Sequence, residues 1–300
     1  MRRRVVLTRL APSRLSPAVR RELRDLLRLP PPLLSSPEMA LARRSERAAF
    51  RCPLERCAHP IGLPIGRWNP FVATAREILA GRAASVEGST LDRYYRAFQP
   101  RNAGEALLGF VDAPPELRRS HPTAALCTPW QQLMPQEIGS KVRAWVQADH
   151  HEHGVPDVNL DHGFKYFGPV DNRLAALEFE RLRALTASLQ QHGYQRRRGD
   201  VFVEVLKRDH EYLFLTSGGG MHRTVASAAV GLTEVPARPV APLIDVNRAS
   251  DWPNVRSGLW SLTRAKRYFH HLFDFDFLGW AVRHRLVTES PVGVSTAEAA

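Results

Sequence analysis

The sequence has few cysteines and no long apolar run. Its 300 residues include only three cysteines, too few for a disulfide framework. No stretch reaches the roughly 18–20 apolar residues that span a bilayer, and the basic start lacks the apolar segment of about 7–15 residues that marks a secretory signal. These absences exclude the disulfide-rich secreted class and a membrane-spanning protein, and they predict a cytoplasmic location.

Lysine is also scarce, although the chain is basic. The formal net charge is +12, and lysine supplies four of the 42 basic residues. Residues 1–56 hold 14 arginines against five acidic residues, which is nine of the twelve net charges. Such a segment suits nucleic acid, an anionic membrane or an acidic partner, while the bias toward arginine is also typical of codon composition.

Two groups of potential metal ligands lack a recognisable spacing. Cys52 and Cys57 are followed by His59, but no fourth ligand stands out, so ordinary thiols are favoured over a zinc site. Residues 149–168 gather more: His150, His151, Glu152, His153, Asp157, Asp161 and His162. Without a standard ligand spacing, that segment is predicted to be a solvated loop, and a divalent-metal site is the less favoured alternative.

The pattern divides the chain into four regions. They are a basic, partly helical region (1–88), a helical and irregular segment (89–148), a regular domain (149–285) and a mobile tail (286–300). In the first region an amphipathic helix is expected after Ser16, either packed on the fold or lying in a membrane interface. Further helices are expected over 69–81 and 259–273, and two short ones over 90–108.

A long helix is expected over 173–192. Asp171 or Asn172 suits its N-cap, and Gly193 follows its end. Glu178 falls within the apolar stripe of this helix. A carboxylate that points inward must be paired with a cation or reached by water in a cavity. Two interpretations therefore stand: an ion pair with Arg181, or a carboxylate that lines a cleft as a general base.

A hairpin followed by a glycine loop comes next. Residues 201–206 and 212–216 are rich in β-branched and aromatic residues and predict two strands. Ser217, Gly218, Gly219 and Gly220 follow directly, and a helix rich in small residues is expected from about residue 221. A further strand over 235–240 contains two prolines, which predicts an edge or irregular position.

This order of elements suits an anion. Glycines let the backbone approach a ligand and adopt positive φ, and the first N–H groups of a helix have no intrahelical partner and favour negative charge. Together they form a phosphate cradle. His222 and Arg223 are positioned to add charged donors, Thr224 a hydroxyl and Lys165 a point charge. The alternative is a tight turn capped by His222.

The residues from about 174 to 240 resemble the ParB/sulfiredoxin-like fold. The similarity rests on Ser188 and Gly193 at the end of the helix, on the Gly-Gly-Met-His-Arg run and on Glu234-Val235-Pro236-Ala237. Sulfiredoxins carry cysteine where this chain has Met221, so reduction of sulfinic acid is excluded. The resemblance implies an α+β fold with a small sheet and packed helices, here with a mostly helical N-terminal extension and a C-terminal helix.

The resemblance also implies a bound nucleoside triphosphate such as ATP, with Mg²⁺. Some members are switches on DNA, and others are kinases of small molecules that use a carboxylate as base. Flanking segments resemble bacterial proteins associated with surface-polysaccharide gene clusters. The leading hypothesis is an ATP-dependent phosphotransferase acting on a small hydroxyl-bearing molecule or glycan precursor, with Glu178 and His222 catalytic. A nucleotide-gated DNA-binding regulator and a catalytically silent scaffold are the alternatives.

Overall fold

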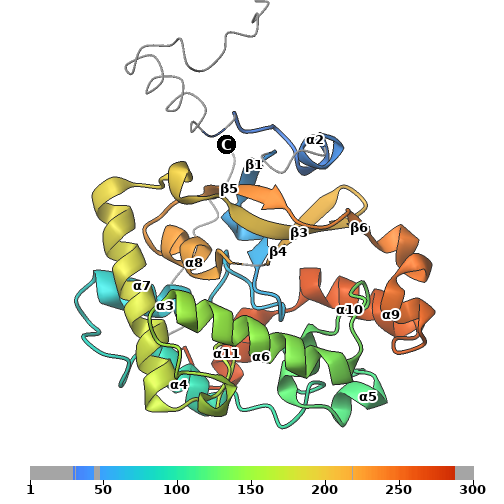
Figure 1. The fold of residues 1–300 in the computed structure, drawn as a ribbon, viewed down its shortest axis with the longest axis horizontal. Helices are drawn as coiled ribbons and strands as arrows, with labels where there is room; N and C mark the ends of the chain where they lie inside the picture. Colours follow the sequence, from blue (N-terminus) through green and yellow to red (C-terminus); the bar gives the residue numbers. More distant parts are fainter. Residues whose placement is uncertain (1–29, 31, 44–47, 218, 288–300) are drawn as a thin grey trace, which may run out of the picture.

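The computed structural model describes Pro30 and residues 32–43, 48–217 and 219–287. These residues form an α+β fold in which a six-stranded mixed sheet packs against helices. In Figure 1 the sheet lies in the upper half, most helices lie below it, and α2 lies above it. The helix expected after Ser16 and most of the predicted tail lie outside the described residues.

The elements follow one another along the chain with short connections. The α-helices are α2 (Pro37–Ala42), α3 (Pro70–Leu79), α4 (Thr90–Ala97), α5 (Pro115–Arg118), α6 (Pro135–Glu152), α7 (Asn172–His192), α8 (Met221–Ala229), α9 (Pro253–Arg256), α10 (Leu262–Asp274) and α11 (Phe277–Arg283). The strands are β1 (Phe50–Pro53), β2 (Cys57–Ala58), β3 (Val201–Arg208), β4 (Glu211–Thr216), β5 (Glu234–Pro239) and β6 (Ile244–Asp245). Short 3₁₀ segments are η2 (Leu54–Arg56), η3 (Pro122–Leu126), η4 (Leu160–His162), η5 (Arg196–Arg198) and η6 (Val246–Asp251).

The sheet joins segments from distant parts of the chain. Its order is β1-β5-β3-β4-β2, and β6 pairs with β3. The predicted hairpin is confirmed, because β3 and β4 are antiparallel neighbours. Strand β2 runs parallel to β4, and β1 runs antiparallel to β5. The sheet therefore takes strands from both sides of the boundary predicted at residue 88.

Strand β5 was expected at an edge or in an irregular position, and the edge position is wrong, because β5 lies between β1 and β3. The two ladders are offset along the strand. Residues 234–237 pair with β1, and residues 237–239 pair with β3. Pro236 is thus paired on one side and Pro239 on the other. A proline in a central strand is tolerated here because neither proline has to serve both ladders.

Three of the predicted helices are present among the described residues. Asp171 caps α7 by accepting a hydrogen bond from the Leu174 amide, and Gly193 follows the end of the helix with a φ of 64°. The helix expected over 69–81 is α3, and the one expected over 259–273 is α10. Over 90–108 only α4 forms, since the residues after Pro100 make turns instead of a second helix.

The predicted loop over 149–168 is wrong at its start, because α6 continues to Glu152. Pro135 occupies the first turn of α6, and Glu137 binds back to the amide of Met134. The buried residues of α6 recur at helical spacing: Pro135, Ile138, Val142, Val146 and His150. His150 completes the stripe although it is a histidine, because its Nδ1 bonds the carbonyl of Val158 at 2.6 Å.

One connected set of buried apolar residues runs from Leu34 to Leu286 and spans the regions that the sequence divided. Helices α3, α7 and α8 pack on one another, and this packing fixes α8 at the end of the hairpin. No helix among the described residues combines the length and apolarity needed to cross a membrane.

Candidate functional site

The glycine loop lies between β4 and α8, as predicted. The Ser217 amide still bonds the Phe202 carbonyl at 2.8 Å, after which the chain leaves the sheet. Gly219 and Gly220 have φ values of 109° and 110°, a region that favours glycine. Gly220 is the N-cap of α8 and provides no side-chain cap, so no N-cap side chain competes with a ligand for the first amides of the helix. Gly218 lies outside the described residues.

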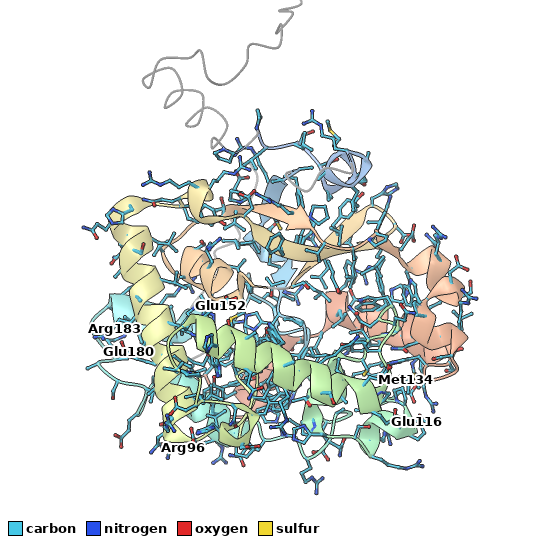
Figure 2. The ribbon with its side chains drawn as sticks, viewed as in Figure 1. Arg96, Glu116, Met134, Glu152, Glu180 and Arg183 are labelled. Carbon is cyan, nitrogen blue, oxygen red and sulfur yellow. The ribbon has the colours of Figure 1, made fainter. Side chains whose placement is uncertain are left out.

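A cavity of about 680 Å³ opens in front of this loop. That volume is in the range of pockets that hold small molecules. Ser217, Gly219, Gly220 and residues 221–223 form one wall. The loop is therefore not covered by packed apolar neighbours, and a ligand can reach it. The end of α6 also lines the cavity, and Figure 2 labels Glu152 at that end of the helix.

Lys165 lies in the cavity wall, where the sequence placed a cation for phosphate. Its backbone carbonyl accepts a hydrogen bond from the Tyr95 hydroxyl at 2.9 Å, which fixes the segment before α7. The ammonium lies 4.7 Å from the centre of the Trp145 ring and 3.7 Å from the Asp149 carboxylate. The Lys165 side chain is largely buried, and the Trp145 ring and the Asp149 carboxylate hold its charged end at the cavity.

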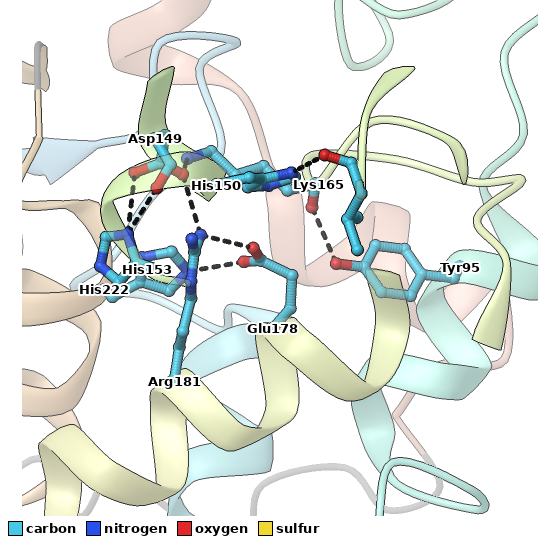
Figure 3. Close-up of polar contacts among 9 residues, drawn as sticks. Tyr95, Asp149, His150, His153, Lys165, Glu178, Arg181 and His222 are labelled. Carbon is cyan, nitrogen blue, oxygen red and sulfur yellow. Dashed lines mark hydrogen bonds and ion pairs between the residues drawn. The ribbon is translucent and has the colours of Figure 1, made fainter. Parts of the chain in front are cut away.

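His222 is held by Glu178, which is its partner in a network of charged groups (Figure 3). The His222 Nε2 lies 2.5 Å from Glu178 Oε2. The other oxygen of Glu178 accepts a hydrogen bond of 3.1 Å from Arg181, which also bonds Asp149 at 2.9 Å. The ion pair expected between Glu178 and Arg181 is therefore present, and His222 joins it from α8.

Glu178 does not occupy the place that a general base requires. It is fully buried, and it is absent from the wall of the cavity. Burial alone would raise its pKa, but the nearby charges of His222, Lys165 and Arg181, with the hydrogen bond from His222, lower its pKa to about 2. The prediction that Glu178 lines a cleft is wrong, since its carboxylate is taken up by two partners and positions His222 instead.

Arg223 and Thr224 were both expected to contact phosphate, but only Arg223 lines the cavity. Arg223 lines the cavity, with Nη1 donating to the Gly199 carbonyl at 2.6 Å and the guanidinium 5.9 Å from the Tyr194 ring. Thr224 is fully buried, and its hydroxyl donates to the Met221 carbonyl at 2.7 Å. The expected phosphate contact of Thr224 is wrong, because its hydroxyl turns back onto its own helix.

Several residues of the site were not expected from the sequence. Asp149 connects α6 to α7 through its ion pair with Arg181, and it also supports Lys165. Glu204 on β3 lines the cavity. Its signal in the sequence is an acidic residue within a run of apolar strand residues, which is expensive to bury without a role. No pattern in the sequence pointed to Asp149, because residues 149–168 were predicted to form a loop.

The described residues contain no group of three or more histidine, cysteine or acidic side chains that could hold a metal ion. The histidines of the 149–168 segment are separated, with His150 buried and His153 exposed at the end of α6. Cys52 and Cys57 are buried with their sulfur atoms 3.4 Å apart. Burial raises the pKa of the Cys52 thiol, as does its neighbour Cys57.

Comparison of the chain with protein-family models, with curated proteins and with solved structures gave no match.

Proposed function

We propose that the protein binds a nucleoside triphosphate in this cavity and transfers a phosphoryl group to a small hydroxyl-bearing molecule or glycan precursor. One observation carries the proposal: a cavity of about 680 Å³ has the glycine loop, the start of α8 and three basic side chains in its wall. Those side chains are Lys165, His222 and Arg223. The similarity of residues 174–240 to ParB/sulfiredoxin-like modules supports the same ligand.

The phosphate groups would lie against Gly219 and Gly220, where the backbone has no side chains in the way and the start of α8 favours negative charge. Lys165 and Arg223 would neutralise the phosphate oxygens, Arg223 through the planar guanidinium. His222 would donate a hydrogen bond, with its orientation fixed by Glu178. Phosphoryl transfer depends mostly on such positioning and charge neutralisation.

The residues present fit a nucleotide-bound Mg²⁺ better than a metal site made of protein alone. Mg²⁺ is usually held by one or two carboxylates together with substrate phosphates. Asp149 is engaged by Arg181 and Lys165, whereas Glu152 lines the cavity and makes no ion pair within the described part of the chain. Glu152 would therefore be the carboxylate ligand, and Mg²⁺ would neutralise phosphate charge.

Isothermal titration calorimetry with Mg²⁺-ATP, Mg²⁺-CTP and Mg²⁺-GTP tests this proposal. The wild-type protein should bind at least one of them, and Lys165→Met should weaken binding about 10-fold or more, because a charge-assisted contact to phosphate is lost. Lys141→Met is the matched control, since Lys141 is exposed on α6 and away from the cavity. A wild-type protein that binds none of the three nucleotides would overturn the proposal.

A further inference from the structure

A second part of the cavity wall contains Glu204. This residue lies on β3 directly opposite Leu215 of β4, and both side chains line the cavity. Leu215 is followed by Thr216 and Ser217, which lead into the glycine loop. Glu204 and the glycine loop therefore line one cavity.

The Glu204 carboxylate is held by uncharged donors alone among the described residues. The Trp130 indole donates to Oε2 at 3.0 Å, and the Gln131 amide donates to Oε1 at 2.5 Å. Burial raises the pKa of Glu204, although these two hydrogen bonds act in the opposite direction. A carboxylate removed from water without a cation is unfavourable unless another donor reaches it. The open side of Glu204 faces the cavity, so a ligand can supply that donor.

Two buried hydroxyls also lack partners at this cavity. Thr128 and Thr216 line it and are 4% and 2% exposed. Neither Oγ1 has a hydrogen-bond partner within the described residues. Buried polar atoms in proteins are nearly always bonded. Both hydroxyl oxygens are covered by protein, so the case for a ligand at this end of the cavity rests on Glu204.

Of the other carboxylates near the cavity, Glu152 is assigned to Mg²⁺ in the proposed function, and Glu178 and Asp149 are unsuited to contact a reacting hydroxyl. Glu178 is fully buried and bonded to His222 and Arg181. Asp149 is engaged by two cations, Arg181 and Lys165. An anion that is already neutralised accepts a proton poorly, whereas a carboxylate with neutral partners accepts one more readily.

We propose that Glu204 is the general base that receives the proton of the acceptor hydroxyl. The inference rests on the proposed phosphoryl transfer and adds where the acceptor binds. The acceptor oxygen forms a bond to the terminal phosphorus while the hydroxyl proton passes to a Glu204 oxygen. The bond between that phosphorus and the bridging oxygen breaks, and its electron pair leaves with the nucleoside diphosphate. Trp130 and Gln131 orient the carboxylate toward the acceptor.

Other ionisable groups share the cavity, so the pH dependence must be assigned by comparing variants. They are Asp149, Glu152, His153, Lys165, Tyr166, His222 and Arg223. Loss of transfer at low pH that comes from Glu204 should vanish when Glu204 is replaced by an amide, whereas loss that comes from the other groups should persist.

The experiment combines binding with transfer. Calorimetry measures the affinity for Mg²⁺-ATP, and radiolabelled Mg²⁺-ATP measures transfer to water and to a panel of polyols, hydroxy acids and simple sugars. Glu204→Gln should keep the ATP affinity within about 3-fold, lower kcat about 100-fold or more and lose the acid limb of the pH profile. Glu204→Asp, which retains the charge on a shorter side chain, should lower kcat and keep that limb.

Glu180→Gln is the control, because Glu180 is exposed and paired with Arg183 on the outer side of α7 (Figure 2). Wild-type kcat and an unchanged acid limb in Glu204→Gln would overturn this inference and leave the proposed function standing. ATP binding without transfer to water or to any compound of the panel would also overturn it. A wild-type protein that binds no nucleotide would remove both proposals.

Discussion

At the scale of single residues, Glu178 links the stability of the protein to pH. Its pKa is lowered from 4.5 to about 2 in the folded protein, so the folded state holds its carboxylate ionised more firmly than the unfolded state does. The corresponding stabilisation is present above about pH 4.5 and is lost as the pH falls toward 2. It is on the order of 3 kcal/mol at neutral pH.

Glu178→Gln should therefore reduce the free energy of unfolding at pH 7 by about 3 kcal/mol, since a buried charged network loses its central anion. The difference from wild type should shrink as the pH is lowered from about 4.5 toward 2, where the wild-type carboxylate also becomes neutral. Urea unfolding across this pH range measures both effects. A difference that stays constant with pH would contradict the assignment of the lowered pKa to Glu178.

At the scale of elements, the glycine loop contains a matched pair of positions. Gly219 and Gly220 both have positive φ near 110°, but only one is crowded. A Cβ on Gly220 would lie 3.0 Å from Cγ1 of Val201, whereas a Cβ on Gly219 would meet nothing within 4 Å. Backbone strain is thus common to both positions, and steric conflict is specific to Gly220.

We expect Gly219→Ala to destabilise the protein by about 1 kcal/mol through strain alone. Gly220→Ala should be clearly more destabilising, because Val201 in the central strand β3 must also move. Chemical denaturation of the two variants gives the comparison. Equal losses of stability would show that the loop does not press against β3 as described.

The elements also show what the sequence can predict. Helix α7 was predictable because Asp171 caps one end, Gly193 follows the other, and the apolar stripe lies between them. The hairpin was predictable from its β-rich runs. The helical spacing of the apolar residues also predicted that Glu178 points inward. It did not identify His222, 44 residues later, as the partner of Glu178. Contacts between distant elements leave no local pattern.

Strands β1 and β2 show the same limit. They have four and two residues, which is too short for an alternating pattern to be recognised. Their place in the sheet is decided by pairing with β5 and β4. In the site, Lys165 was expected to reach a phosphate from its position before α7, and it lines the cavity. Thr224 was misplaced because helical phase, and not proximity in sequence, decides where its hydroxyl points.

At the scale of the whole molecule, the sheet makes the first and last parts of the chain interdependent. A fragment of residues 89–287 lacks β1 and β2 and exposes two long edges, of β5 and β4. It also lacks α3, which packs on α7 and α8. We expect no cooperative thermal unfolding from this fragment by circular dichroism. A sharp transition would instead support a separate domain beginning after residue 88.

The alternative of a nucleotide-gated DNA-binding regulator also belongs at this scale. Any DNA affinity that comes from the basic residues 1–56 should fall steeply with salt. Most aromatic residues of the segment after β5 are buried, Trp260 and Phe269 among them, so that segment contributes to the core. We expect fluorescence anisotropy at about 50 mM salt to give the same DNA affinity with and without Mg²⁺-nucleotide. A large nucleotide-dependent change would favour the regulator.

The central claim is that the glycine loop and the start of α8 bind the phosphates of a nucleotide. Amide chemical shifts in the ¹⁵N-labelled protein test it most directly, since they report on each backbone N–H separately. On addition of the nucleotide that binds, the account predicts the largest shifts at Gly219, Gly220 and residues 221–223. Saturable binding that leaves these five amides unshifted would contradict it.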